Sequence, residues 1–139
     1  METPKAILFV TSGECAPGPS PALASALAKA GYQVKMADIS EIEDIDIRYT
    51  PAMAIAGLSG RREEELQTCH RLIRSINAPL IVISPLDDVD VRIAALDSGI
   101  VDYLVSPISP LIVAARVKSI LQRWAQNPSG RDISSSPDY

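Results

Sequence analysis

Short, uninterrupted apolar runs alternate with longer amphipathic segments along this chain of 139 residues. Runs of this kind, bounded by Gly, Ser or Pro, are typical of strands that are covered on both faces of a parallel sheet. The predicted strands lie at residues 6–10, 32–37, 53–56, 80–83 and 102–105. Apolar side chains at helical spacing predict helices at residues 22–30, 61–76, 89–98 and 110–124. This alternation favours an α/β fold with a doubly wound, five-stranded parallel sheet and right-handed crossovers.

The connection between the second and third strands is irregular. Residues 38–51 leave room for about one or two helical turns, so the second helix of the fold is expected to be shortened or lost. After residue 124 the composition shifts to Asn, Pro, Ser, Gly and Asp, which is typical of linkers and disordered segments. The sequence therefore predicts one domain over residues 1–124 and a disordered tail or linker over residues 125–139.

Composition argues against several classes of partner. The net charge is −4 and only 4% of the residues are aromatic, so this segment lacks the basic, base-stacking surface that nucleic acid requires. No apolar run approaches the ~18 residues of a membrane span, and the residues after Met1 lack the pattern of a signal peptide. Cys15 and Cys69 form no CxxC motif and are expected to be reduced thiols. These features predict a cytoplasmic domain that binds neither nucleic acid nor a membrane directly.

Hydroxyl residues and glycine stand where the predicted strands end, at Thr11, Ser12, Gly57, Ser84 and Ser106. In doubly wound folds the carboxyl ends of the strands form the crevice where ligands bind and chemistry takes place. None of these residues is a carboxylate or a lysine, so we expect a small, neutral, polar pocket that is satisfied by water. The pattern predicts no metal, no cofactor and no catalytic residue, and it favours signalling over enzymatic activity.

The second half of the chain carries the most specific motifs. Residues 78–84 (APLIVIS), residues 96–107 (LDSGIVDYLVSP) and the helix that follows Ser109 resemble the fourth strand, the fifth-strand region and the last helix of response-regulator receiver domains, the CheY-like family. The resemblance implies a flavodoxin-like fold. It also implies a role in bacterial two-component signal transduction.

Receiver domains of this family work by phosphorylation of an aspartate at the end of the third strand, with Mg²⁺ held by acids after the first strand and a lysine after the fifth. The resemblance puts Gly57 at the phosphoacceptor position, Thr11 and Ser12 at the acidic positions and Ser106 at the lysine position. Glycine has no side chain to form an acyl phosphate, and neutral hydroxyls bind Mg²⁺ far more weakly than carboxylates. The sequence therefore predicts a degenerate pseudo-receiver that lacks the phosphoacceptor aspartate.

Two residues of the family's switch are retained. Ser84 matches the hydroxyl that moves toward the phosphoryl group, and Tyr103 matches the switch aromatic. A cryptic phosphoacceptor is not favoured, because Glu14 reads as a solvated loop carboxylate and Asp87 and Asp88 as charges at a helix N-terminus. The resemblance thus implies that part of the switch persists without its trigger.

Four charged residues, Asp97, Asp102, Arg116 and Lys118, match positions that form cross-subunit salt bridges in winged-helix response regulators. The acidic mate that the family provides for Arg92 on the last helix is absent. Two interpretations stay open for this face, a symmetric dimer and a solvated charged surface. Exposed ion pairs set orientation more than they contribute energy.

The function predicted from the sequence is therefore a phosphorylation-independent module for protein–protein interaction or dimerisation, with a protein partner or a second copy. The alternative is a small-molecule sensor that binds in the neutral crevice beneath residues 15–21. The glutamates at 63–65 are expected to form an exposed, salt-bridged surface with Arg61 and Arg62. His70 reads as a partly exposed helix residue.

Overall fold

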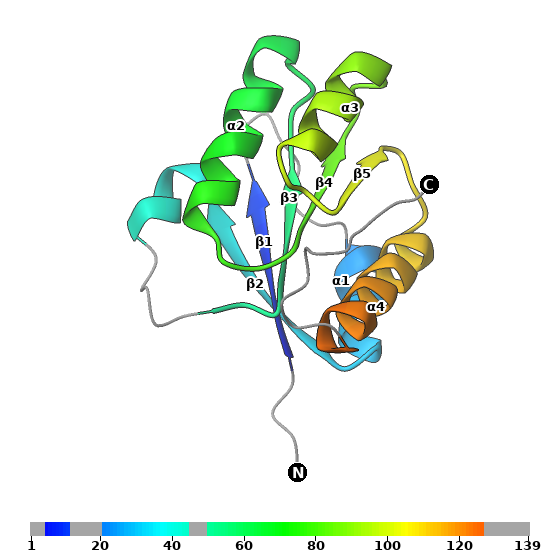
Figure 1. The fold of residues 1–139 in the computed structure, drawn as a ribbon. Helices are drawn as coiled ribbons and strands as arrows, with labels where there is room; N and C mark the ends of the chain where they lie inside the picture. Colours follow the sequence, from blue (N-terminus) through cyan, green and yellow to red (C-terminus); the bar gives the residue numbers. More distant parts are fainter. Residues whose placement is uncertain (1–4, 12–20, 45–49, 127–139) are drawn as a thin grey trace.

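A five-stranded sheet whose neighbouring strands all run parallel organises the chain (Figure 1). The computed structural model describes residues 5–11, 21–44 and 50–126. The strands are β1 (Lys5–Thr11), β2 (Tyr32–Asp38), β3 (Met53–Gly57), β4 (Leu80–Ser84) and β5 (Asp102–Val105). They lie in the order β2-β1-β3-β4-β5, which is the flavodoxin-like order of doubly wound folds. The predicted fold class is confirmed.

Helices cover both faces of the sheet (Figure 1). On one face α1 (Pro21–Lys29) packs beside α4 (Pro110–Gln126), and on the other α2 (Arg62–Ser75) packs beside α3 (Val89–Asp97). Parallel strands require crossover connections, and helices on both faces allow the central strands to be buried on both sides. Every residue of β3 is accordingly buried.

A short 3-10 helix, η1 (Ile39–Asp44), follows β2 where the fold would carry its second α-helix. Its turn is stabilised locally, because the Asp38 carboxylate accepts a hydrogen bond from the backbone N–H of Ser40 at 2.9 Å. Ile42 then buries its side chain in the core. Residues 45–49 lie outside the described part of the chain. The prediction of a shortened helix agrees with what is described.

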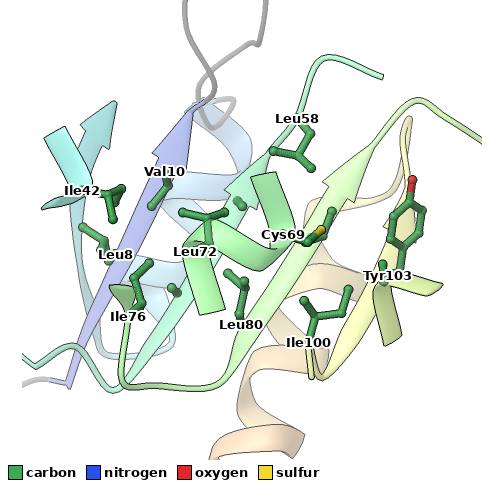
Figure 2. Close-up of a cluster of buried hydrophobic side chains, with 14 of the residues drawn as sticks. Leu8, Val10, Ile42, Leu58, Cys69, Leu72, Ile76, Leu80, Ile100 and Tyr103 are labelled. Carbon is green, nitrogen blue, oxygen red and sulfur yellow. The ribbon is translucent and has the colours of Figure 1, made fainter. Parts of the chain in front are cut away.

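The sheet divides the hydrophobic core into two halves. On β1, Leu8 and Val10 point into the half beneath α2, where Leu72 packs (Figure 2), whereas Ile7 and Phe9 point into the half beneath α1 and α4. Alternate residues of one strand therefore enter different halves of the core. This is the reason why the strands read as uninterrupted apolar runs.

Asp88 and Ser109 cap the last two helices, and Asp88 does more than the helix-terminal charge expected from the sequence. The carboxylate of Asp88 accepts hydrogen bonds from the backbone N–H groups of Asp90 at 2.9 Å and Val91 at 3.1 Å. The hydroxyl of Ser109 accepts from the N–H of Leu111 at 3.2 Å. Each cap satisfies N–H groups that have no partner within their own helix.

The last helix ends slightly later than the predicted helix at residues 110–124. Helix α4 continues to Gln126, two residues past the expected end of the domain at 124, and residues 127–139 lie outside the described part of the chain. Within residues 5–11, 21–44 and 50–126, no helix is long and apolar enough to cross a membrane.

Candidate functional site

The carboxyl ends of the strands bring four of the five predicted crevice residues to one edge of the sheet. Thr11 ends β1, Gly57 ends β3, Ser84 ends β4 and Ser106 follows β5 directly. The β1–β3 register pairs Thr11 with Gly57, and the backbone N–H of Ser106 donates to the carbonyl of Ser84 at 2.9 Å. Their proximity follows from the parallel topology.

The fifth predicted crevice residue, Ser12, lies outside the described residues, as do Glu14 and Cys15 in the loop that was expected to cover a ligand. Of the crevice positions that are described, Gly57 is buried and Thr11 is half-buried. In the part of the chain that the structure describes, no three His, Cys, Asp or Glu side chains gather in a way that could hold a metal ion.

A buried carboxylate lies directly beside this edge of the sheet. Glu65, in the first turn of α2, is only 2% exposed. Its Oε2 accepts hydrogen bonds from the Ser84 hydroxyl at 2.7 Å and from the backbone N–H of Gly60 at 3.2 Å. Its Oε1 accepts from the Tyr103 hydroxyl at 3.0 Å. A hydroxyl bond to an ionised acceptor is stronger than one between neutral groups.

The expectation of an exposed acidic cluster at 63–65 is therefore wrong for Glu65. The phase of the helix explains the difference, because Glu65, Cys69 and Leu72 are the buried residues of α2 and lie at positions i, i+4 and i+7. Glu64 behaves as expected, since it is exposed and lies 3.5 Å from Arg61 in an ion pair. The spacing of Glu65 to Cys69 was the signal that could have revealed the buried carboxylate.

Ser84 and Tyr103 belong to one network with the loop before α3. The Ser84 hydroxyl donates to Glu65 and accepts from the backbone N–H of Leu86 at 3.1 Å. The Tyr103 hydroxyl lies 3.1 Å from the carbonyl of Leu86 as well as 3.0 Å from Glu65, so its single hydrogen has two acceptors. The expectation of a neutral, water-satisfied pocket is wrong at Ser84, whose partner is a carboxylate.

Burial raises the pKa values of two groups here, the Tyr103 hydroxyl and the thiol of the nearby Cys69. It raises the pKa of the Tyr103 hydroxyl to about 12, and the nearby Glu65 carboxylate acts in the same direction. Burial likewise raises the pKa of the Cys69 thiol to about 12, again with a contribution from Glu65. Both groups are therefore protonated and neutral near pH 7, and a thiol in this state is a poor nucleophile.

Arg92 of α3 covers the ring of Tyr103. Its guanidinium carbon lies 5.8 Å from the ring centroid, within the range of a cation–π interaction. Tyr103 itself is only 4% exposed and points up toward the carboxyl ends of the strands (Figure 2). Arg92, for which the sequence offered no acidic partner on the last helix, thus contacts the ring of Tyr103.

The surface made by α3, β5 and α4, here called the α3–β5–α4 face, carries the four predicted partner residues. Arg116 lies 3.3 Å from the Asp102 carboxylate of the same chain. Asp97 ends α3 and Lys118 lies on α4, and both are exposed. The structure therefore provides an intrachain partner for two of the residues that were expected to pair across a dimer.

Large apolar side chains are also exposed on the two helices of this face. On α3 and α4 they are Val89, Ile93, Leu96, Leu111 and Ile112. The three on α3 follow positions i, i+4 and i+7 and therefore line one side of that helix.

Proteins with sequences similar to this chain are regulators. A protein named "Probable transcriptional regulator ycf27" from Porphyridium aerugineum is 32% identical over 107 residues, which cover 76% of this chain and 45% of the relative. The response regulator MprA of Mycobacterium leprae is 29% identical over 109 residues, 76% of this chain and 47% of the relative. The chain spans about half the length of these relatives. No protein-family model matches the chain.

Solved structures agree with these sequence relatives. A response regulator from Thermotoga maritima superposes with a TM-score of 0.65 at 22% identity, covering 85% of this chain and 98% of the other. The chain is a CheY-like receiver domain. The BeF3-activated N-terminal receiver domain of Klebsiella pneumoniae RstA gives a TM-score of 0.63 at 21% identity, covering 85% and 99%.

The resemblance described from the sequence assigns phosphorylation positions to the strand ends. Gly57 ends β3, where the resemblance expects the phosphoacceptor, and Thr11 and Ser106 stand at two of its partner positions. The residues that the pattern retains, Ser84 and Tyr103, both bond to a carboxylate that comes from α2. The acceptor that Ser84 and Tyr103 share is therefore a side chain of the domain itself, Glu65.

Proposed function

We propose that this receiver domain is a signalling module that acts through protein–protein contacts without aspartyl phosphorylation. The observation that carries the proposal is Gly57, a residue without a side chain at the end of β3. An acyl phosphate requires a carboxylate oxygen as the nucleophile, and glycine offers none. The proposal also assigns the domain a cytoplasmic, non-enzymatic role.

The loss of the other phosphorylation residues supports the same proposal. Thr11 and Ser106 are neutral, so they offer neither a strong Mg²⁺ ligand nor a positive charge for a phosphoryl group. Glu65, whose carboxylate accepts from Ser84, has both oxygens occupied by hydrogen bonds and is buried. It is poorly placed to attack a phosphodonor from solvent.

Phosphodonor treatment tests this part of the proposal. The protein is incubated with acetyl phosphate and Mg²⁺, and in parallel with beryllofluoride and Mg²⁺, beside a receiver domain that has the phosphoacceptor aspartate. We expect an unchanged intact mass and unchanged backbone amide shifts in α3, whereas the comparison protein responds to both reagents. A mass increase of one phosphoryl group would overturn phosphorylation independence.

The partner that we propose is a second copy of the domain, docked through the α3–β5–α4 face. This face combines exposed apolar side chains on α3 and α4 with charges of both signs, including Asp97 and Lys118. A two-fold interface brings the same patch of both copies together. A patch with both signs of charge can therefore be complementary to itself, which a patch of one sign cannot.

A single charged substitution tests the face. Ile93 is 54% exposed on α3, and Met36 is 61% exposed on β2 at the opposite edge of the sheet. We expect Ile93→Lys to weaken self-association in light scattering, and the matched control Met36→Lys to leave it unchanged. Equal masses for wild type and Ile93→Lys across the concentration range would remove the proposed dimer.

A further inference from the structure

The Glu65 carboxylate connects parts of the chain that are distant in sequence. Glu65 lies on α2, and it accepts from Gly60 before that helix, from Ser84 at the end of β4 and from Tyr103 on β5. Ser84 in turn accepts from the backbone N–H of Leu86, in the loop that leads to α3. The carboxylate is therefore the common acceptor of a buried network.

We infer that Glu65 is a positioning residue whose carboxylate holds Ser84 and Tyr103 in their buried positions and thereby sets the conformation of the α3–β5–α4 face. The three groups that reach it are neutral donors, two hydroxyls and one N–H. The carboxylate is an acceptor for all three, and for Tyr103 it shares this role with the carbonyl of Leu86, so the orientation of these groups depends on it.

Packing alone does not account for a carboxylate at this place. Glu65 is 2% exposed, and a buried carboxylate is costly unless hydrogen bonds compensate for lost water. An apolar side chain of similar size would fill the same volume without that cost, but it would accept no hydrogen bond. Compared with an apolar side chain, Glu65 therefore adds a hydrogen-bond acceptor. The side chains that donate to this acceptor are Ser84 and Tyr103.

The network reaches the α3–β5–α4 face through two contacts. The Tyr103 ring lies beneath the guanidinium of Arg92 on α3, so a change in the position of the ring removes a support of that helix. Tyr103 also follows Asp102, whose carboxylate accepts from the N–H of Tyr103 at 3.0 Å and pairs with Arg116 of α4. The expected effect of Glu65 on self-association rests on the proposed function. The hydrogen bond by which Glu65 positions Tyr103 does not.

Fluorotyrosine NMR of the full chain measures the hold on Tyr103 directly. The Tyr103 signal is assigned with Tyr103→Phe, and its solvent exposure is read from broadening by a soluble paramagnetic reagent. In Glu65→Gln we expect a shifted Tyr103 signal that broadens several-fold more than in wild type, because Gln offers one acceptor oxygen where Glu65 uses two and places an NH₂ donor beside the hydroxyls. Glu64→Gln, which alters an exposed neighbouring carboxylate, should leave the signal unchanged. An unshifted, still protected signal in folded Glu65→Gln overturns the inference.

If Glu65→Gln does not fold, hydrogen exchange of the wild-type protein tests the network instead. Gly60 and Leu86 both donate their backbone N–H to the network, and we expect these amides to exchange at least about tenfold more slowly than exposed loop amides. Exchange at loop rates would overturn the network without any substitution.

Light scattering of the same samples separates this inference from the proposed dimer. A released Tyr103 together with weakened self-association in Glu65→Gln supports both. A released Tyr103 with unchanged self-association overturns the coupling of Glu65 to the face. A wild-type protein that stays monomeric at all concentrations overturns the proposed dimer, while the Tyr103 signal still decides whether Glu65 holds the ring.

Discussion

The buried hydroxyl of Ser84 donates one hydrogen bond and accepts another. It is 0% exposed, donates to Glu65 and accepts from the backbone N–H of Leu86. A side chain in this situation affects stability mainly through the partners that its removal leaves unsatisfied. At the scale of single residues, the buried network is therefore expected to be sensitive to the loss of one oxygen atom.

The first prediction concerns that oxygen. Ser84→Ala should lower the free energy of unfolding by about 1–3 kcal/mol, because it leaves the half-buried N–H of Leu86 without its acceptor and the Glu65 carboxylate with one donor fewer. Urea unfolding followed by circular dichroism measures the change. Ser119→Ala, on the exposed surface of α4, is the matched control and should shift stability by no more than about 0.5 kcal/mol. Similar losses in the two variants would contradict the assigned role of Ser84.

The second prediction concerns Tyr103 in alkaline solution. Burial raises the pKa of this hydroxyl from 10.0 to about 12, so the folded protein keeps a proton that the unfolded chain has released. Stability from this group is complete below pH 10 and is lost as the pH rises toward 12. The loss should reach about 2–3 kcal/mol, since one pKa unit corresponds to about 1.4 kcal/mol.

Urea unfolding between pH 9 and pH 12 measures this loss against Tyr103→Phe, which has no titrating group at this position. Cys69 also has a raised pKa and is present in both proteins, so the difference between the two curves reports the Tyr103 hydroxyl together with its electrostatic interaction with Cys69. Wild type should lose stability relative to Tyr103→Phe over this interval. Parallel curves would show that the Tyr103 hydroxyl is not buried in the folded state.

At the scale of elements, α3 is short and depends on its first turn. It spans Val89–Asp97, and Asp88 accepts from the N–H groups of both Asp90 and Val91. Asp88 also forms an ion pair with Arg62 at the start of α2. The Asp88 side chain thus caps the start of α3 and also links it to α2 through the ion pair with Arg62.

The third prediction follows for this cap. Asp88→Ala should cost about 1–2 kcal/mol of stability and speed the exchange of amides in the first turn of α3. Asp88→Asn, which keeps an acceptor oxygen, should recover most of the loss. The adjacent Asp87 is exposed and makes a suitable control, because its replacement by Ala removes a nearby charge without removing the cap. An equal effect at both positions would indicate a charge effect and not a cap.

The elements could be predicted from the sequence because their signals are local. Apolar runs define the strands, and Ser109 and Asp88 mark where helices begin. The gathering of Thr11 and Gly57 also follows once the sheet is parallel. The role of Glu65 could not be predicted in full, because its donors come from β4, β5 and a loop.

At the scale of the whole molecule, the large apolar side chains that are exposed among the described residues lie mainly on α3 and α4, and Met36 lies on the edge strand β2. The proposed contact is two-fold, so a substitution on the α3–β5–α4 face enters the interface twice. This property distinguishes a symmetric dimer from a head-to-tail chain of copies. In a head-to-tail chain each contact contains the substituted surface once.

The fourth prediction uses mixtures of wild type and Ile93→Lys. Loss of one buried apolar contact is expected to weaken a mixed pair about tenfold, and loss of two to weaken a pair of variants about a hundredfold or more. Native mass spectrometry of wild-type, mixed and variant pairs, distinguished by isotope labelling, measures all three dissociation constants in one sample. Met36→Lys in the same mixtures should give three equal constants, since β2 lies at the far edge of the sheet. If the mixed pair instead binds about as tightly as a wild-type pair while the variant pair is weakened, each contact contains Ile93 only once, and the two-fold arrangement is wrong.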